Sequence, residues 1–310
     1  MEMLNISRTG EGIFRALLLA TLIGVVGCAA PAKRGTPNPT AEKVAPHEEP
    51  RGEVYGPFPT SAPSAPLVSD PDRIVLVFGK GLTHGFAYVG VLRALQELKV
   101  PVHAIYATET GALAGALYFT QKNLNRIDWA LLRFNEKNLG KREGKISFRL
   151  SSPEKALEES LQEVFGETRL ESIADRLHVW LEDTKTEESF DARSGSLSSA
   201  LRGALAGANE YAPAELEGRN VRASNTKLSE LYQRARETEK YPVVVVAAGA
   251  PPTELFRKLL ENEKSTLLYV PLPGMDDLEI KRRNQAVFSG KNAVHKAAKE
   301  ILSLVGRKSE

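Results

Sequence analysis

One stretch, residues 73–119, limits the possible folds of this chain more than any other. Its sequence is RIVLVFGKGLTHGFAYVGVLRALQELKVPVHAIYATETGALAGALYF, which predicts strand, glycine loop, helix, strand, tight turn and helix. Residues 74–78 are an apolar run that ends at Gly79, as is typical of a buried parallel strand. Pro101 marks the return to an extended segment at 102–106. Such a unit indicates an α/β protein.

The loop after the first strand carries three glycines, Gly79, Gly81 and Gly85. Glycines let the backbone turn sharply and present N–H groups at a helix start, so the loop is predicted to be an anion or oxyanion site. With Glu109 at the end of the next strand, the spacing also loosely matches a dinucleotide-binding fingerprint. A second helix that begins directly at Thr110 fits a hydrolase corner better.

Two motifs carry a resemblance to a known family. GFAYVGVLRAL at residues 85–95 and ATETGAL at 107–113 resemble the N-terminal unit of the patatin-like phospholipases. In that family the first strand leads into G-G-G-x-R-G, and the second leads into G-T-S-x-G-A-L. The resemblance implies a three-layer α/β/α fold with a mainly parallel central sheet, and lipid acyl hydrolysis by a Ser–Asp dyad.

The residues at the oxyanion-loop and nucleophile positions depart from the family pattern. The oxyanion-loop equivalents are Gly79, Lys80, Gly81, Leu82, His84 and Gly85. Lys80 and Leu82 replace glycines, His84 replaces the arginine, and Glu109 stands in place of the nucleophilic serine. A carboxylate nucleophile would form a mixed anhydride and repel the oxyanion that it helps to create. Loss of the serine therefore favours a pseudoenzyme.

A second segment extends the resemblance. Residues 194–225, SGSLSSALRGALAGANEYAPAELEGRNVRASN, resemble the stretch that leads to the family's aspartate in D-G-G or D-G-A. Arg222 then takes the place of the aspartate, and Asp191 is an alternative carboxylate that precedes the helix. In the family the two dyad positions lie within hydrogen-bond reach. The resemblance thus predicts an ion pair between Glu109 and Arg222 that closes the old site.

The N-terminal region has the features of a bacterial lipoprotein signal. Arg8 and Arg15 precede an apolar run at 16–27, which is too short to span a bilayer as a helix but suits a signal peptide. The run leads into VVGC, which resembles a lipobox, so Cys28 is predicted to carry the lipid. An ordinary signal peptide or a buried cysteine is the alternative. Ala29 after the cysteine favours the outer membrane by analogy with lipoprotein sorting.

Composition divides the chain further. Ten of its 18 prolines fall between Pro31 and Pro71, where no periodic apolar pattern survives, so this part is predicted to be a disordered tether. The predicted organisation is a signal peptide at 1–27, a lipidated tether at 28–72, a patatin-like domain at 73–306 and a tail at 307–310.

Past residue 119 helical and extended patterns alternate. Helices are predicted at 125–132, 153–165, 196–208, 253–262 and 291–305, strands at 177–181, 241–247 and 267–270, and loops at 136–145 and 183–188. The run YPVVVVA at 241–247 is predicted to lie in the centre of the sheet. Such alternation indicates a mainly parallel sheet covered on both faces.

Overall composition restricts the possible structures and partners of the chain only a little. The hydrophobic content of 42% in 310 residues permits a full core, and a single cysteine excludes an intramolecular disulfide. The net charge of +2 argues neither for nor against a polyanionic partner, and no nucleic-acid partner is predicted. The histidines at 47, 84, 103, 178 and 295 lack metal-ligand spacing, so neither a metal nor a cofactor is predicted.

Together these features predict an outer-membrane lipoprotein of the cell envelope whose patatin-like domain has lost its dyad. The predicted role is binding or scaffolding, with the membrane reached through the lipid on Cys28 and an envelope protein or a lipid as the ligand. The alternative is an active lipid acyl hydrolase with a rearranged site.

Overall fold

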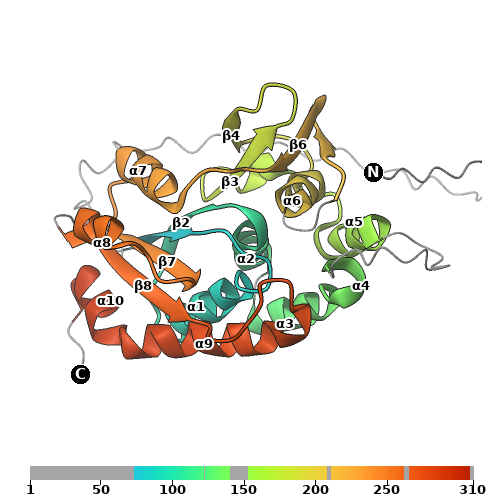
Figure 1. The fold of residues 1–310 in the computed structure, drawn as a ribbon. Helices are drawn as coiled ribbons and strands as arrows, with labels where there is room; N and C mark the ends of the chain where they lie inside the picture. Colours follow the sequence, from blue (N-terminus) through green and yellow to red (C-terminus); the bar gives the residue numbers. More distant parts are fainter. Residues whose placement is uncertain (1–72, 122, 140–152, 208–210, 262–264, 308–310) are drawn as a thin grey trace, which may run out of the picture. The chain divides into compact units, whose positions relative to one another are not determined.

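The structure is a computed structural model that describes residues 73–121, 123–139, 153–207, 211–261 and 265–307 (Figure 1). The chain divides into two units, Met1–Ser64 and Ala65–Glu310, and all described residues belong to the second. The predictions for the signal peptide, for Cys28 and for the tether lie outside the described residues. So do positions 140–145 of the predicted loop and 308–310 of the predicted tail.

An eight-stranded sheet forms the middle of the described domain, in the order β5-β6-β3-β2-β1-β7-β8, with β4 also paired to β3. The strands are β1 Ile74–Phe78, β2 Val102–Ala107, β3 Leu177–Asp183, β4 Ser189–Ala192, β5 Ala214–Leu216, β6 Arg219–Ala223, β7 Val243–Gly249 and β8 Ser265–Pro271. Strands β3, β2, β1, β7 and β8 pair in parallel, whereas β4, β5 and β6 join antiparallel. The predicted α/β class with a central sheet and flanking helices is confirmed.

Helices cover both faces of this sheet. They are α1 Phe86–Glu97, α2 Glu109–Thr120, α3 Leu124–Arg133, α4 Glu136–Leu139, α5 Pro153–Phe165, α6 Leu197–Ala206, α7 Leu228–Thr238, α8 Glu254–Glu261, α9 Arg283–Lys296 and α10 Ala298–Leu304, with short 3₁₀ turns at Leu170–Ser172 and Ile280–Arg282. Figure 1 shows α7 and α8 on the opposite side of the sheet from α1 and α9. In the described part, no helix combines the length and the apolar character needed to cross a membrane.

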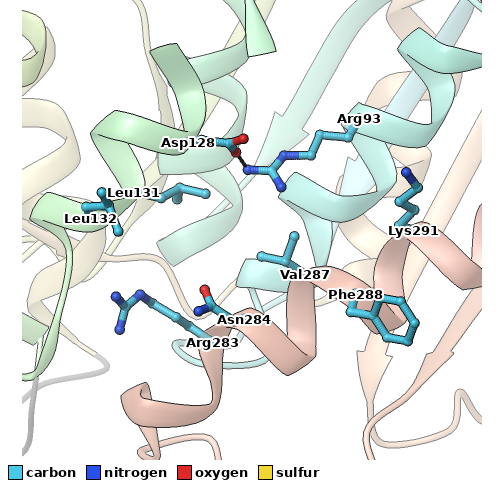
Figure 2. A pocket seen from close by; sticks show the side chains of 9 residues that line it. All are labelled: Arg93, Asp128, Leu131, Leu132, Arg283, Asn284, Val287, Phe288 and Lys291. Carbon is cyan, nitrogen blue, oxygen red and sulfur yellow. Dashed lines mark ion pairs between the residues drawn. The ribbon is translucent and has the colours of Figure 1, made fainter. Parts of the chain in front are cut away.

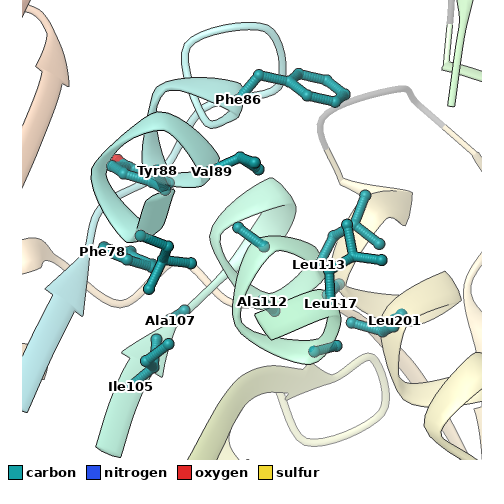
Figure 3. Packing of buried hydrophobic residues seen from close by; sticks show 14 of the residues in the cluster. Phe78, Phe86, Tyr88, Val89, Ile105, Ala107, Ala112, Leu113, Leu117 and Leu201 are labelled. Atoms are coloured by element: carbon teal, nitrogen blue, oxygen red, sulfur yellow. The ribbon is translucent and has the colours of Figure 1, made fainter. Parts of the chain in front are cut away.

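The two faces follow from the period of two along each strand. In β1, Ile74, Leu76 and Phe78 join the larger hydrophobic cluster, which includes α1 and α2, whereas Val75 and Val77 join the cluster under α7 and α8. All five are fully buried, so the strand has no polar face and its sequence is continuously apolar. Figure 3 shows α1 and α2 side by side above β1 and β2.

Helix α9 crosses α1 at two glycines. A Cβ atom on Gly90 would overlap the carbonyl oxygen of Val287, and one on Gly290 would overlap that of Ala87. The two backbones therefore touch with no side chain between them. Since α1 begins directly after the glycine loop, this crossing also holds the loop's helix in place.

Several element predictions are confirmed and others are wrong. Helix α5 has the predicted bounds and ends before Gly166, whose φ of +53° explains the stop. The predicted loop at 136–145 begins instead with helix α4, and the predicted helix at 291–305 is two helices, of which the first begins at Arg283. Strand β7 lies inside the sheet, but between β1 and the edge strand β8 rather than at the centre.

Candidate functional site

The glycine loop between β1 and α1 is shaped by close contacts that exclude side chains. Gly81 has a φ of +144°, which L-residues rarely adopt. A Cβ atom on Gly85 would lie 2.5 Å from the carbonyl oxygen of Gly81 and 2.6 Å from Cβ of Thr110. The loop thus packs directly against the start of α2.

Glu109 lies at the sharp corner where β2 passes into α2. Its φ is +48°, a left-handed conformation that costs a non-glycine residue about 1–2 kcal/mol. Such strain is typical of a nucleophile elbow. The side chain is 9% exposed, and its Oε2 accepts a hydrogen bond of 2.7 Å from the amide of Gly81. The backbone turn at this corner is the one that the resemblance implies. The Glu109 carboxylate, however, accepts the hydrogen bond of an amide that belongs to the oxyanion loop.

A second carboxylate, from Asp277, occupies the next amides of the loop. The amide of Leu82 donates to Oδ2 at 2.9 Å and the amide of His84 donates to Oδ1 at 2.7 Å. The His84 ring also lies 3.0 Å, through Nε2, from the carbonyl oxygen of Met275. The predicted anion site is therefore filled by the protein's own acids. Sequence reasoning missed Asp277, because nothing local to it indicates a partner about 195 residues away.

The surroundings of this corner shift the pKa of the Glu109 carboxyl group upward. Burial raises the pKa of its carboxyl group above the usual range, Asp277 adds to the rise, and the Gly81 amide and Lys80 oppose it. Burial also raises the pKa of the Tyr88 hydroxyl, and Glu109 and Asp277 strengthen that effect. Burial thus disfavours the charged forms of Glu109 and Tyr88, although the Gly81 amide donates to Glu109.

This raised pKa has a consequence for stability. A carboxyl group with a higher pKa in the folded state stabilises the fold fully below its unfolded pKa, about 4.3, and loses that contribution as pH rises through the folded pKa. Relative to a Glu109→Gln variant, the wild-type protein should therefore lose free energy of unfolding as pH rises above about 4. Denaturant titrations of both proteins between about pH 3.5 and 8 measure the difference.

A Glu97→Gln variant serves as the matched control. Hydrogen bonding to Lys291 lowers the pKa of Glu97, so the wild type should gain stability relative to this variant as pH rises. If the free energies of unfolding of the wild type and of Glu109→Gln change with pH in parallel over the whole range, the buried position of the Glu109 side chain is contradicted.

Arg222 does not reach Glu109, so the predicted ion pair is wrong. Its Nε donates to Oε1 of Glu182 at 2.7 Å, and Nη2 donates to the same oxygen. Among the described residues, Glu109 forms no ion pair. The reason is strand register: Arg222 lies directly opposite Glu182 in the antiparallel pairing of β6 with β3, so their side chains share a face.

The end of β6 nevertheless reaches the glycine loop, through Asn225. Its Oδ1 accepts a hydrogen bond of 3.0 Å from Nζ of Lys80, and its Nδ2 donates to Oε2 of Glu182 at 3.2 Å. The segment is thus near the site, as the resemblance implies, but the residue in contact is three positions beyond Arg222. The signal for Asn225 was present only as its place in the resembling stretch.

The other sequence candidates take structural roles. Asp191, the alternative carboxylate, lies 2.7 Å from Nδ1 of His178 and accepts from Arg193 at 3.1 Å. Within the ranges that the structure describes, no group of three or more His, Cys, Asp or Glu residues is arranged to hold a metal ion.

Among the described residues, Glu109 and Arg222 do not form the dyad that the resemblance implies for ester hydrolysis. A dyad requires a hydroxyl at the corner, a carboxylate to accept its proton and free donors for the oxyanion. Here the corner residue is an acid, Arg222 is paired with Glu182, and the amides of Gly81, Leu82 and His84 already donate to carboxylates.

Comparisons with known proteins agree with the resemblance. Residues 76–221 match the family model described as "Patatin-like phospholipase". The human "Patatin-like phospholipase domain-containing protein 6" is 42% identical over 64 residues, which are 19% of this chain and 5% of that protein. "Neuropathy target esterase sws" of Drosophila melanogaster is 38% identical over 56 residues, 18% of this chain and 4% of that protein. The chain thus matches only about a twentieth of these relatives' length.

Among solved structures, the chain is similar to VipD from Legionella pneumophila. The two align with a TM-score of 0.45 and 12% sequence identity, over 76% of this chain and 67% of that chain. Residues 76–221 form a patatin-like phospholipase domain by sequence.

Proposed function

From this patatin-like domain we propose a pseudoenzyme, which binds a ligand or partner and does not hydrolyse esters. One observation carries the proposal: the carboxylate of Glu109 accepts the hydrogen bond of the Gly81 amide at 2.7 Å. The nucleophile position and an oxyanion donor are thereby both occupied by one acidic side chain. An ester carbonyl has neither an alcohol to attack it nor that donor to stabilise the resulting charge.

An esterase assay on the purified protein tests this proposal. Hydrolysis of a short p-nitrophenyl ester and of a long-chain phospholipid should both equal the rate in buffer. Glu109→Ser should show no activity either, because it supplies no carboxylate partner for the new serine and leaves the amides of Leu82 and His84 bound to Asp277. Loss of a nucleophile alone lowers the rate about 10⁶-fold in a well-studied protease. An active and an inactive protein should therefore differ clearly in this assay.

Two variants make the result decisive. Turnover by the native protein that disappears in Glu109→Ala but persists in a remote variant such as Lys258→Ala would overturn the pseudoenzyme proposal. It would instead establish the alternative, a lipid acyl hydrolase with a rearranged site.

The proposal places the protein at the outer membrane of the cell envelope, held by a lipid on Cys28. The support is the short apolar run before VVGC and the proline-rich stretch that follows it. In this role the domain binds or scaffolds an envelope protein or a lipid near the membrane. An intact mass of the mature chain that shows an unmodified first residue would exclude the anchor.

A further inference from the structure

A groove separate from the Glu109 corner lies between α3 and α9. Its volume is about 340 Å³, and its apolar lining comes from Leu131 and Leu132 of α3 and from Val287 and Phe288 of α9. Figure 2 shows the two helices facing each other across this space, with Arg93 of α1 projecting between them. We refer to it as the α3–α9 groove.

Large apolar side chains are exposed on the two helices that line this groove, and two of them, Leu132 and Phe288, belong to its lining. Among the described residues four such side chains are exposed, and three of them lie on α3 or α9: Trp129 at 52%, Leu132 at 64% and Phe288 at 64%. Single exposed apolar residues need no explanation, but a group on two adjacent helices indicates an interaction surface.

The same two helices concentrate positive charge. They carry five Lys and Arg residues (Arg126, Arg133, Arg283, Lys291 and Lys296) and one acidic residue, Asp128, in a chain whose net charge is only +2. Asp128 is paired with Arg93, and Lys291 is paired with Glu97. Among the described residues Arg283, which lines the groove, forms no ion pair. The groove therefore presents an uncompensated cation beside exposed apolar side chains.

We propose that the α3–α9 groove docks on an anionic membrane surface. Leu132 and Phe288 of the groove, together with Trp129 on the same helix α3, enter the boundary between headgroups and acyl chains, where tryptophan is favoured, while Arg283 meets the lipid phosphates. The groove lies at the low end of the range for ligand pockets, about 300–1,000 Å³, which suits contact with a surface better than enclosure of a whole phospholipid. This contact goes beyond the proposed lipid on Cys28, because it belongs to the domain itself.

Tryptophan quenching by brominated lipids tests the proposal on the full chain. The protein has two tryptophans, of which Trp129 is exposed on α3 and Trp180 is half-buried in β3. Vesicles of brominated phosphatidylglycerol should quench Trp129, and vesicles of brominated phosphatidylcholine should not. Arg283→Glu should weaken the apparent affinity for the anionic vesicles by at least about fivefold, since each Lys or Arg near such a surface contributes about 1 kcal/mol.

Three variants serve as controls. Trp129→Phe should abolish the quenching, which separates docking of α3 from attachment through the N-terminal region. Phe288→Ser should reduce it, and Lys258→Glu should leave it unchanged, because Lys258 is exposed on α8 across the sheet. Quenching by neither vesicle would overturn the proposal and leave the groove to a partner protein. Equal quenching by both vesicles, unaffected by Arg283→Glu, would overturn it too.

Discussion

Gly290→Ala is expected to lower the free energy of unfolding by about 3 kcal/mol. On helix propensity alone the same change should stabilise α9 by about 1 kcal/mol, so the sign of the effect is itself the test. The physical reason is that the new methyl group would overlap the carbonyl oxygen of Ala87, which is backbone and cannot rotate away. The helices α1 and α9 must then separate, and the buried groups between them lose contact.

Urea titration measures the change, and two further variants sharpen it. Ser289→Ala, next to Gly290 on α9, should alter stability by less than about 0.5 kcal/mol. Gly90→Ala should be as harmful as Gly290→Ala, because its Cβ atom would meet the carbonyl oxygen of Val287. The double variant should cost less than the sum of the two, since the first substitution already separates the helices. A stabilising Gly290→Ala would show that the two backbones do not touch.

Arg222→Ala is expected to destabilise the protein by about 2–3 kcal/mol. The change leaves the carboxylate of Glu182 without its ion-pair partner, and that side chain is only 5% exposed. The value lies below the range for a fully buried pair, because the Arg222 side chain is 43% exposed and water screens it. Asn225 continues to donate one hydrogen bond to Glu182, which also limits the loss.

A double-substitution cycle distinguishes this pair from other causes of instability. Arg222→Met combined with Glu182→Leu should recover most of the stability, because no buried charge remains. Arg219→Ala on the same strand, whose guanidinium lies over the Phe190 ring, should cost less than about 1 kcal/mol. An Arg222→Ala protein as stable as the wild type would mean that the pair with Glu182 is solvated.

The parts that the sequence predicted well are those with strong local signals. β1 is a continuous apolar run because both of its faces are buried, and the helix at 153–165 has clear helical periodicity before a glycine. The sharp corner at Glu109 was also predictable, since a strand that passes directly into a helix leaves few backbone solutions. The strands β4, β5 and β6 were missed because they are short and mix polar with apolar residues.

The chemistry at the centre of the site depended on contacts that no local pattern records. The sequence by itself determined that Glu109 sits at the corner and that the glycine loop can bind an anion. Only the tertiary structure decided which anions fill it, because Asp277 reaches the loop from about 195 residues away and Glu109 turns toward Gly81. The partner of Arg222 was decided in the same way: the antiparallel register of β3 and β6 places it opposite Glu182, and register depends on long-range packing of whole strands.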